Sequence, residues 1–485
     1  MKDERLFFIG IGGIGMSALA RWYHHQGATV AGHDRTETAL TRALVEEGIL
    51  VNTSGDRSAL PTDLLADLDA GRTDRWTVIR TPAVPDDFPL LTLLRKAGFP
   101  VLKRAELLGK LTKGRPLLAV AGTHGKTTTS TLLAHLLHQD GTAVEAFLGG
   151  IARSTGSNLM LAEAAGEDSP APWTVVEADE FDRSFLTLHS THAIITSADA
   201  DHLDIYGTEQ SLHAAMVEFG RQVDSGGLIL HETVAAAFAA TGHTPPSHTC
   251  YGALCTKNTL PDGWEGGHST PSGSANHCTF QLHLAGHDPV DIHWSMPGDH
   301  NAANATAAAI LAMRAGLTPA SIARGLASFP GIARRFEVRH DSPALTVIDD
   351  YAHHPSEIAS TIAAARSAYA SRRLVGVFQP HLFSRTRDFL DEFASALSEL
   401  DLCILLPIYP AREEPIPGVD AQAIGEKMVG CPVKCPEESR FLDVLQTCDP
   451  DVLLFMGAGD LDQWIPRAID RLSTPTSTRE TTPQA

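Results

Sequence analysis

The segment that most constrains the fold is a run of nine residues, AGTHGKTTT, at positions 121–129. Residues 116–121 are apolar, as in a buried strand, and residues 128–138 have the apolar spacing of a helix. A glycine-containing turn between a strand and a helix directs backbone N–H groups and the positive end of the helix dipole at one place. Lys126 adds a charge for the β- and γ-phosphates, and the Thr127 hydroxyl is placed to ligate Mg²⁺. The segment therefore predicts an ATP site.

The match to the usual phosphate-loop pattern is incomplete. Val120 stands where the GxxxxGK[ST] pattern has its first glycine, and Gly-Lys-Thr also occurs in plain turns with an exposed lysine. The strand before the turn and the helix after it favour phosphate binding over a plain turn. The expected ATP contacts in this segment are Gly122, Thr123, His124, Gly125, Lys126, Thr127 and Thr128.

Bulk properties limit the class of protein. A length of 485 residues predicts about three domains, at roughly 150 residues each. No apolar stretch reaches the roughly 18–20 residues that span a bilayer, and the N-terminal segment lacks the pattern of a secretory signal, so we expect a cytoplasmic protein. The net charge of −20 argues against partners such as nucleic acid or an anionic membrane. Seven cysteines without a Cys-x-x-Cys pair indicate reduced thiols rather than disulfides or a zinc site.

Strand-like and helix-like segments alternate along the chain, which predicts an α/β fold with mostly parallel sheets. We expect a first domain at residues 1–108, a central domain at 109–330 and a third at 331–472. The polar tail, 473–485, is expected to be disordered. Residues 241–278 are rich in Gly, Thr, Ser, Pro and His and predict a long surface loop or hairpin region.

A second glycine-rich turn, GIGGIG at residues 10–15, follows a short apolar strand and opens a helix. Asp34 closes the next strand, where a ribose-binding acid lies in a dinucleotide-binding unit. The turn is compatible with NAD, with another nucleotide diphosphate, or with a tight strand–helix turn alone. A phosphate-loop segment also lies further along the chain. We therefore favour a nucleotide diphosphate other than NAD as the ligand of this turn, and disfavour a dehydrogenase.

Two acidic segments each follow an apolar strand. Glu177, Asp179 and Glu180 follow one of them, and a carboxylate at such a strand end beside a phosphate loop is a common Mg²⁺ ligand. Glu177 is the best candidate. The second segment, DADHLD at 199–204, contains His202 and suggests a further metal ligand, since closely spaced phosphate oxygens favour two cations. A solvated acidic turn is the alternative in both cases.

Further candidates lie in the second half of the chain. Asn301 and Asn304 lie at the start of an Ala-rich segment with helical spacing, residues 302–327. Their side chains could bind the edge of an adenine, or they could simply cap the helix. Three polar segments follow: RRF at 334–336, DDYAHHP at 349–355 and QPHLFSR at 379–385. The last two come after predicted strands, at the edge where open α/β sheets bind ligands.

Taken together, these motifs resemble the Mur ligase family, up to about residue 470. The motifs that carry the resemblance are GIGGIGMS (10–17), GTHGKTTT (122–129), EADEFDRSFL (177–186), DADHLDIYG (199–207), HNAANA (300–305), DDYAHHPSEI (349–358), FQPHLFSRT (378–386) and GAGD (457–460). The resemblance implies three α/β domains. These are a Rossmann-like UDP-binding N-terminal domain, a central P-loop ATPase-like domain with a parallel sheet, and a Rossmann-like C-terminal domain.

The resemblance also implies a reaction, in which ATP and Mg²⁺ support the joining of L-alanine to the lactyl carboxylate of UDP-N-acetylmuramate through an acyl phosphate. The residues implied for catalysis are Lys126, Glu177, His202 and Arg385. The residues implied as metal ligands are Thr127, Glu177 and His202. Adenine, phosphate and ribose of ATP would be bound by Asn301, Asn304, Arg335 and Asp350. The UDP-sugar would be bound by Gly10, Gly12, Gly13, Ile14, Gly15, Asp34 and Thr81. The amino acid would be bound by Tyr351, His381 and Arg385.

Two departures from family patterns stand out. Many relatives have Arg where this chain has Leu382, which puts one cationic substrate contact in doubt. Residues 209–222 contain no lysine, although several sister ligases carry a metal-bridging lysine carbamate there; family members that add alanine also lack it. The alternatives are a ligase that attaches a whole tripeptide to the same sugar nucleotide, an NAD-dependent dehydrogenase, and a non-catalytic nucleotide sensor. We expect small-molecule substrates and a monomer or weak dimer.

Overall fold

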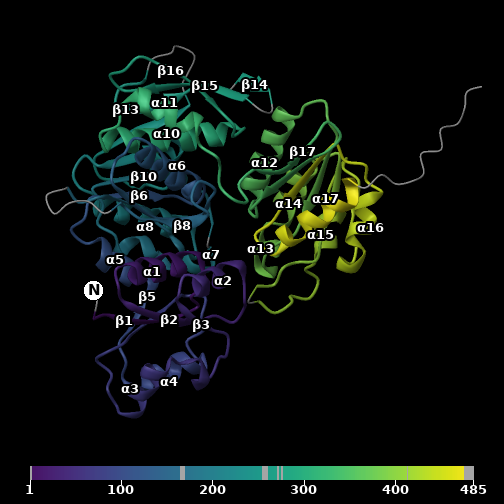
Figure 1. Cartoon of the computed structure of the whole chain (residues 1–485). Coiled ribbons are helices and arrows are strands. Elements are labelled where there is room, and N and C mark those ends of the chain that lie inside the picture. The colour runs from purple at the N-terminus through teal and green to yellow at the C-terminus, as the bar shows by residue number, and fades with distance from the viewer. Residues whose placement is uncertain are drawn as a thin grey trace, which may run out of the picture. The chain divides into compact units, whose positions relative to one another are not determined.

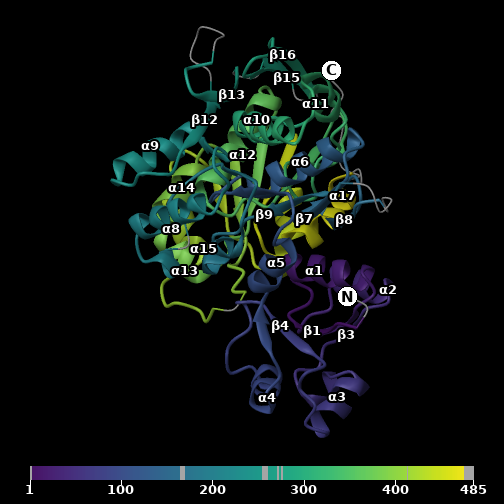
Figure 2. The same cartoon turned by 90° about the vertical axis from the view of Figure 1, so that its left-hand side faces the viewer.

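The computed structural model describes residues 3–163, 170–201, 203–253, 260–269, 272–274, 277–411 and 413–473 (Figures 1 and 2). The chain forms two compact units, of which the first comprises residues 1–270, 280–293 and 302–330 and the second residues 271–279, 294–301 and 331–485. Three separate sheets confirm the predicted three-domain α/β fold. The predicted first domain and most of the central one fall within the first unit.

The first sheet is parallel, in the order β3-β2-β1-β4-β5. Its strands are β1 (Arg5–Ile9), β2 (Thr29–His33), β3 (Leu50–Asn52), β4 (Thr77–Arg80) and β5 (Val101–Lys103). Its helices are α1 (Ile14–His25), α2 (Ala39–Glu46), α3 (Thr62–Asp69), α4 (Pro89–Ala97) and α5 (Arg104–Thr112). The apolar residues of β1 are buried on both faces, as expected for a central parallel strand covered by helices.

Helix α1 joins the first sheet to the central one within the first unit. Its residues from Met16 to Tyr23 are all buried, because one side packs on the first sheet and the other on β7 (Val144–Ala152) and β8 (Ser157–Met160). Trp22 Nε1 donates to Glu145 Oε2 at 3.1 Å across this contact. One continuous apolar core therefore fixes the glycine-rich turn at the start of α1 relative to the central sheet.

The central sheet has the order β14-β15-β13-β12-β11-β10-β6-β9-β7-β8, with β16 beside β15. The strands from β12 to β7 in this order are parallel, and β6 lies between β10 and β9. The further strands are β6 (Leu117–Ala121), β9 (Trp173–Glu177), β10 (His192–Ile195), β11 (Leu228–His231), β12 (His248–Ala253), β13 (Trp264–His268), β14 (Ser272–Ser274), β15 (His277–Leu284) and β16 (Val290–Trp294). The helical elements are α6 (Lys126–Gln139), η2 (Phe181–Thr187), α7 (Leu203–Tyr206), α8 (Glu209–Arg221), α9 (Glu232–Ala240), α10 (Asp299–Arg314) and α11 (Pro319–Ala327).

Two predicted segments have more structure than the sequence indicated. The Ala-rich segment at 302–327 is two helices, α10 and α11, because Thr318 caps the second one and Pro319 starts it. Residues 241–278 include β12 and β13, and the antiparallel pairing of β13 and β14 with β15 confirms the hairpin alternative for their described part. Across the residues that the structure describes, there is no helix with the length and apolarity needed to cross a membrane.

The third sheet, in the second unit, has the order β17-β18-β22-β19-β20-β21, and only β17 is antiparallel to its neighbour. Its strands are β17 (Glu337–Asp341), β18 (Thr346–Asp350), β19 (Leu374–Phe378), β20 (Leu402–Leu405), β21 (Val433–Lys434) and β22 (Val452–Met456). Its helices are α12 (Pro355–Ala368), α13 (Phe383–Asp388), α14 (Leu390–Leu397), α15 (Ala421–Lys427), α16 (Phe441–Gln446) and α17 (Ile465–Ser473). Ser473 ends α17, and the remainder of the predicted disordered tail lies outside the described residues.

Candidate active site

The phosphate-loop segment forms the predicted strand–turn–helix. Strand β6 is fully buried and ends at Ala121, and α6 begins at Lys126. Gly122 and Gly125 have φ of +127° and +81°, which only glycine adopts without strain. Val120, which replaces the first glycine of the usual pattern, is a buried residue of β6 that pairs with Glu177 of β9. The turn therefore starts after Val120, and a glycine is not required there.

Lys126 is held by a buried carboxylate. Its Nζ donates to Glu180 Oε1 at 2.9 Å and to the Gly122 carbonyl at 2.6 Å. The Glu180 side chain is fully buried, and its backbone carbonyl accepts from the Tyr206 hydroxyl at 2.7 Å. Burial lowers the pKa of Lys126, but the carboxylates, Glu180 first, outweigh burial and raise it above its ordinary value. Lys126 is therefore a fixed positive charge at the start of α6.

Thr127 and Glu177 form the oxygen pair expected of a Mg²⁺ site. Thr127 Oγ1 donates to Glu177 Oε1 at 3.1 Å, and β7 approaches so closely that a Cβ on Gly149 would lie 2.5 Å from Glu177 Cδ. The described residues include no cluster of three or more His, Cys, Asp or Glu able to hold a metal. Mg²⁺ commonly takes one or two protein ligands and completes its shell with water and phosphate, and its binding by Thr127 and Glu177 stays a prediction. His202, the remaining expected metal ligand, lies outside the described residues.

The end of β10 braces the phosphate loop, which the sequence did not indicate. Ser197 Oγ accepts from the His124 backbone N–H at 2.6 Å, and the Ser197 carbonyl accepts from the Thr123 N–H at 3.2 Å. The Thr196 hydroxyl donates to the His124 carbonyl at 2.5 Å. A small hydroxyl residue directly after a parallel strand neighbouring β6 is the only sequence signal for these contacts.

The two asparagines of α10 differ in their surroundings. Asn304 packs directly on the phosphate loop, because a Cβ on Gly125 would lie 3.3 Å from Asn304 Cγ, and its Oδ1 accepts from the Thr129 hydroxyl at 3.3 Å. Asn301, one turn earlier, belongs to the second unit, and its Nδ2 donates to the Pro297 carbonyl at 2.7 Å. The structure thus places Asn304 beside the loop, and adenine binding by either residue stays a prediction.

The glycine-rich turn brings together the residues predicted for the UDP-sugar. Asp34 Oδ2 accepts from the Gly12 backbone N–H at 2.8 Å, and Gly13 directly precedes α1. Thr81 lies on the other side of the turn, where its Cγ2 would be 2.7 Å from a Cβ on Gly10. Asp34, the Thr81 side chain and the start of α1 therefore all lie at this turn, and their binding of a diphosphate and a ribose stays a prediction.

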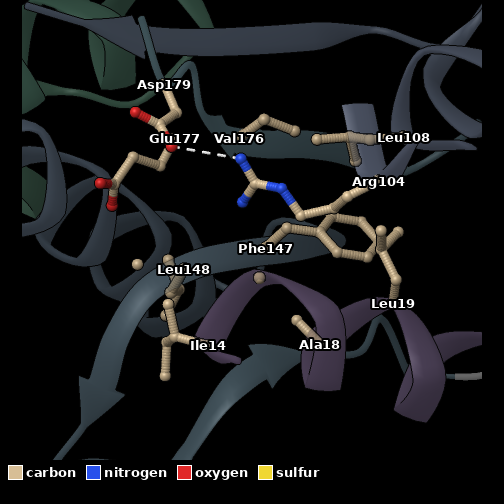
Figure 3. Close-up of a pocket in the computed structure, with 12 residues that line it drawn as sticks. Ile14, Ala18, Leu19, Arg104, Leu108, Phe147, Leu148, Val176, Glu177 and Asp179 are labelled. Atoms are coloured by element: carbon tan, nitrogen blue, oxygen red, sulfur yellow. Dashed lines mark hydrogen bonds and ion pairs between the residues drawn. The ribbon is translucent and has the colours of Figure 1, made fainter. Parts of the chain in front are cut away.

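A pocket extends between this turn and Glu177 (Figure 3). Ile14 and Gly15 line one part of it and Glu177 and Asp179 another. Arg104, at the start of α5, reaches into the pocket, and its Nη2 donates to Asp179 Oδ2 at 3.2 Å. Arg104 was not among the predicted site residues, because its position in the sequence carries no recognisable motif.

In the second unit, Arg335 and Asp350 are close to one another. Asp350 accepts from the backbone N–H groups of Phe336 and Ala352, both at 2.8 Å. Burial raises the pKa of Asp350 to about 6, although Arg335 opposes this shift. The guanidinium of Arg335 lies 5.3 Å from the centre of the Tyr351 ring. Asp350 therefore secures the backbone directly after Arg335 and the turn that follows β18, and its contact with ribose stays a prediction.

The residues predicted for the amino acid lie at the same edge of the third sheet. Tyr351 and His381 each contact His353, with ring centres 5.4 Å and 6.1 Å apart. Arg385 lies in α13, and this helix begins directly after Leu382. The backbone of Leu382 has a φ of +70°. The structure thus brings Tyr351 and His381 together through His353, a residue that the sequence analysis did not single out for this role.

Three family descriptions match the chain: "Mur ligase family, catalytic domain" at residues 5–116, "Mur ligase middle domain" at 120–312, and "Mur ligase, glutamate ligase domain" at 334–459. These ranges cover most of the sequence, and each of the three sheets falls largely within one of them. The chain belongs to the Mur ligase family. The family confirms the predicted class of enzyme, an ATP-dependent ligase, and removes the basis for a dehydrogenase.

Similar proteins cover almost the whole chain. The UDP-N-acetylmuramate–L-alanine ligases of Christiangramia forsetii and Porphyromonas gingivalis are each 41% identical to it, over 96% and 95% of this chain and 97% of each relative. The crystal structure of the UDP-N-acetylmuramate–alanine ligase from Thermotoga maritima matches with a TM-score of 0.78 and 27% identity, covering 97% of this chain and 99% of that one. A murein peptide ligase from Psychrobacter arcticus shares the fold, with a TM-score of 0.70 and 21% identity over 98% and 100% of the two chains.

Proposed function

We propose that this chain joins L-alanine to the lactyl carboxylate of UDP-N-acetylmuramate, with ATP as the energy source, in peptidoglycan precursor synthesis. The observation that carries the proposal is the similarity to ligases of that name over nearly the full length of both chains. The arrangement of Lys126, Thr127 and Glu177 around one turn supports it, since this is the chemistry that transfer of a phosphoryl group needs.

At the ATP end of the site, we propose that Lys126 and the loop N–H groups bind the β- and γ-phosphates. Mg²⁺, held by Thr127 and Glu177, would neutralise charge on the phosphate oxygens as the phosphoryl group moves. Asn301 and Asn304 are proposed for adenine, and Arg335 and Asp350 for phosphate and ribose.

The reaction proceeds in two displacements. An oxygen of the lactyl carboxylate attacks the γ-phosphorus, ADP leaves, and an acyl phosphate forms. The uncharged amine of L-alanine then attacks the acyl carbon, the amide bond forms, inorganic phosphate leaves, and the amine proton passes to water. Tyr351, His381 and Arg385 are proposed to orient the alanine, since a small pocket rejects larger side chains by exclusion.

A substrate panel tests this proposal. Purified protein with ATP, Mg²⁺ and UDP-N-acetylmuramate should release phosphate with L-alanine, and should release far less with larger amino acids. Turnover with the L-Ala-γ-D-Glu-diaminopimelate tripeptide and none with L-alanine would establish the recycling alternative instead. Binding of ATP without turnover of any amino acid would indicate a nucleotide sensor. We further propose that the protein is cytoplasmic. We also propose that it is a monomer or weak dimer, and sedimentation analysis of the same preparation would check this oligomeric state.

A further inference from the structure

The pocket beside α1 connects two parts of the proposed site. Ile14 and Gly15, at the start of α1, belong to the glycine-rich turn proposed for the diphosphate, and Glu177 is the proposed metal ligand. The wall between them is apolar and consists of Ala18, Leu19, Leu108, Phe147, Leu148 and Val176. UDP-N-acetylmuramate has its diphosphate at one end of the sugar and its reactive carboxylate on the lactyl group. The pocket therefore lies where that sugar would have to lie.

Arg104 is the one cationic side chain among the described residues that line this pocket. It is 22% exposed, and its partner Asp179 is 31% exposed, so both remain accessible from the pocket. The backbone of α5 is anchored at this point, because the Lys103 N–H donates to Glu106 Oε2 at 2.7 Å. The guanidinium rests against the start of α1, where a Cβ on Gly15 would lie 3.2 Å from Arg104 Cζ. Figure 3 shows it pointing into the pocket, toward the carboxylates.

A substrate carboxylate entering this pocket meets a difficult electrostatic environment. Glu177 and Asp179 both present carboxylates there, and like charges repel strongly where water is partly excluded. A guanidinium offers planar, paired N–H donors that match a carboxylate. Arg104 already binds one carboxylate, that of Asp179, through a single contact of 3.2 Å, which leaves other guanidinium donors for a second acid.

We propose that Arg104 recognises the lactyl carboxylate of the sugar nucleotide and turns from Asp179 toward it when the substrate binds. This inference rests on the proposed function. It makes Arg104 a specificity-determining residue, which distinguishes a sugar nucleotide that carries the lactyl acid from one that lacks it. A ligand without the acid would leave Arg104 on Asp179 and gain no contact from it, so the two sugar nucleotides should differ in affinity.

Binding measurements with two ligands test the proposal. UDP-N-acetylmuramate and UDP-N-acetylglucosamine, which lacks the lactyl ether, would be titrated calorimetrically into the wild type and Arg104→Met, without ATP. We expect Arg104→Met to weaken binding of the first ligand by about 10- to 100-fold, as for a lost charge-assisted contact, and binding of the second by less than about threefold. Arg104→Lys, which keeps the charge but not the fork, should fall between the two.

Lys103→Met provides a matched control. Lys103 precedes Arg104 and pairs with Asp182 at 2.9 Å, but does not line the pocket, so neither ligand should lose affinity. Equal loss of both ligands in Arg104→Met would overturn the proposal, since the arginine would then act on the shared nucleotide or on the fold. Unchanged binding of UDP-N-acetylmuramate would overturn it as well. A wild type that releases no phosphate from ATP with UDP-N-acetylmuramate and L-alanine would refute the proposed function, a result distinct from failure of the variant alone.

Discussion

Gly149→Ala should disable the proposed metal site without altering its ligands. The strand β7 passes so close to Glu177 that a methyl group on residue 149 would lie 2.5 Å from Glu177 Cδ and 2.6 Å from Oε1, where ordinary contact begins at 3.4 Å. The backbone of Gly149 is in a conformation that alanine also adopts, so the steric conflict falls on the Glu177 side chain. The carboxylate must move away and lose its 3.1 Å contact with Thr127.

The size of the effect follows from the displacement. A shift of about 1 Å in a catalytic group costs on the order of 100-fold in rate, and we expect kcat/KM to fall by roughly that factor. The Mg²⁺ concentration for half-maximal rate should rise at the same time, because the oxygen pair is broken. Both are measured by phosphate release from ATP, UDP-N-acetylmuramate and L-alanine over a range of Mg²⁺ concentrations.

Gly55→Ala is the control for this experiment. A Cβ there meets only Phe88, at 3.6 Å, which is an ordinary contact, so its kinetics should match those of the wild type. If Gly149→Ala has an unchanged Mg²⁺ dependence and rate, Glu177 is not held where the metal is needed, and its assignment as a ligand is wrong. A large loss of thermal stability in Gly149→Ala would also refute the reasoning, since the clash would then have been relieved by the fold.

Three other predictions concern the phosphate loop and the third sheet. Lys126→Met should lower kcat by at least about 100-fold, through loss of the charge at the γ-phosphate, and leave calorimetric binding of the sugar nucleotide unchanged. Gly122→Ala should lower thermal stability measurably, because it combines a φ of +127° with a Cβ 2.8 Å from the Ser197 N atom. Burial raises the pKa of Asp349 to about 7, so this group keeps a proton in the folded chain that it has lost in the unfolded chain, and its contribution to the unfolding free energy should fall as pH rises from about 4 to 7. Asp349→Asn should flatten that dependence in denaturant titrations.

The parts of the fold and site that depend on local sequence could be predicted. The strand, turn and helix around Lys126 were predicted because burial, glycine placement and helical spacing occur within some 25 residues. The parallel sheets followed from the alternation of strands and helices for a similar reason. The division of the segment at 302–327 into two helices was missed, since the cap at Thr318 lies within an otherwise continuous helical pattern.

Contacts between distant segments could not be predicted in this way. Arg104 and Asp179 are 75 residues apart, and their contact exists only because α5 packs against η2. The support of the phosphate loop by Ser197 similarly depends on the pairing of β10 with β6. An arginine or a serine is not unusual at such positions of a sequence. The roles of Arg104 and Ser197 can therefore be recognised only from their contacts in the folded chain.

The acidic cluster after β9 shows what the fold adds to a correctly recognised motif. From the sequence, Glu177, Asp179 and Glu180 were interchangeable candidates for one role, with Glu177 preferred for its position. In the structure each contacts a different partner: Glu177 the Thr127 hydroxyl, Asp179 the Arg104 guanidinium, and Glu180 the Lys126 ammonium. The strand ends at Glu177, and the chain then turns into η2, so successive carboxylates point in different directions. Two of these partners are cations, so before substrate binds two of the three negative charges, those of Asp179 and Glu180, are paired within the protein.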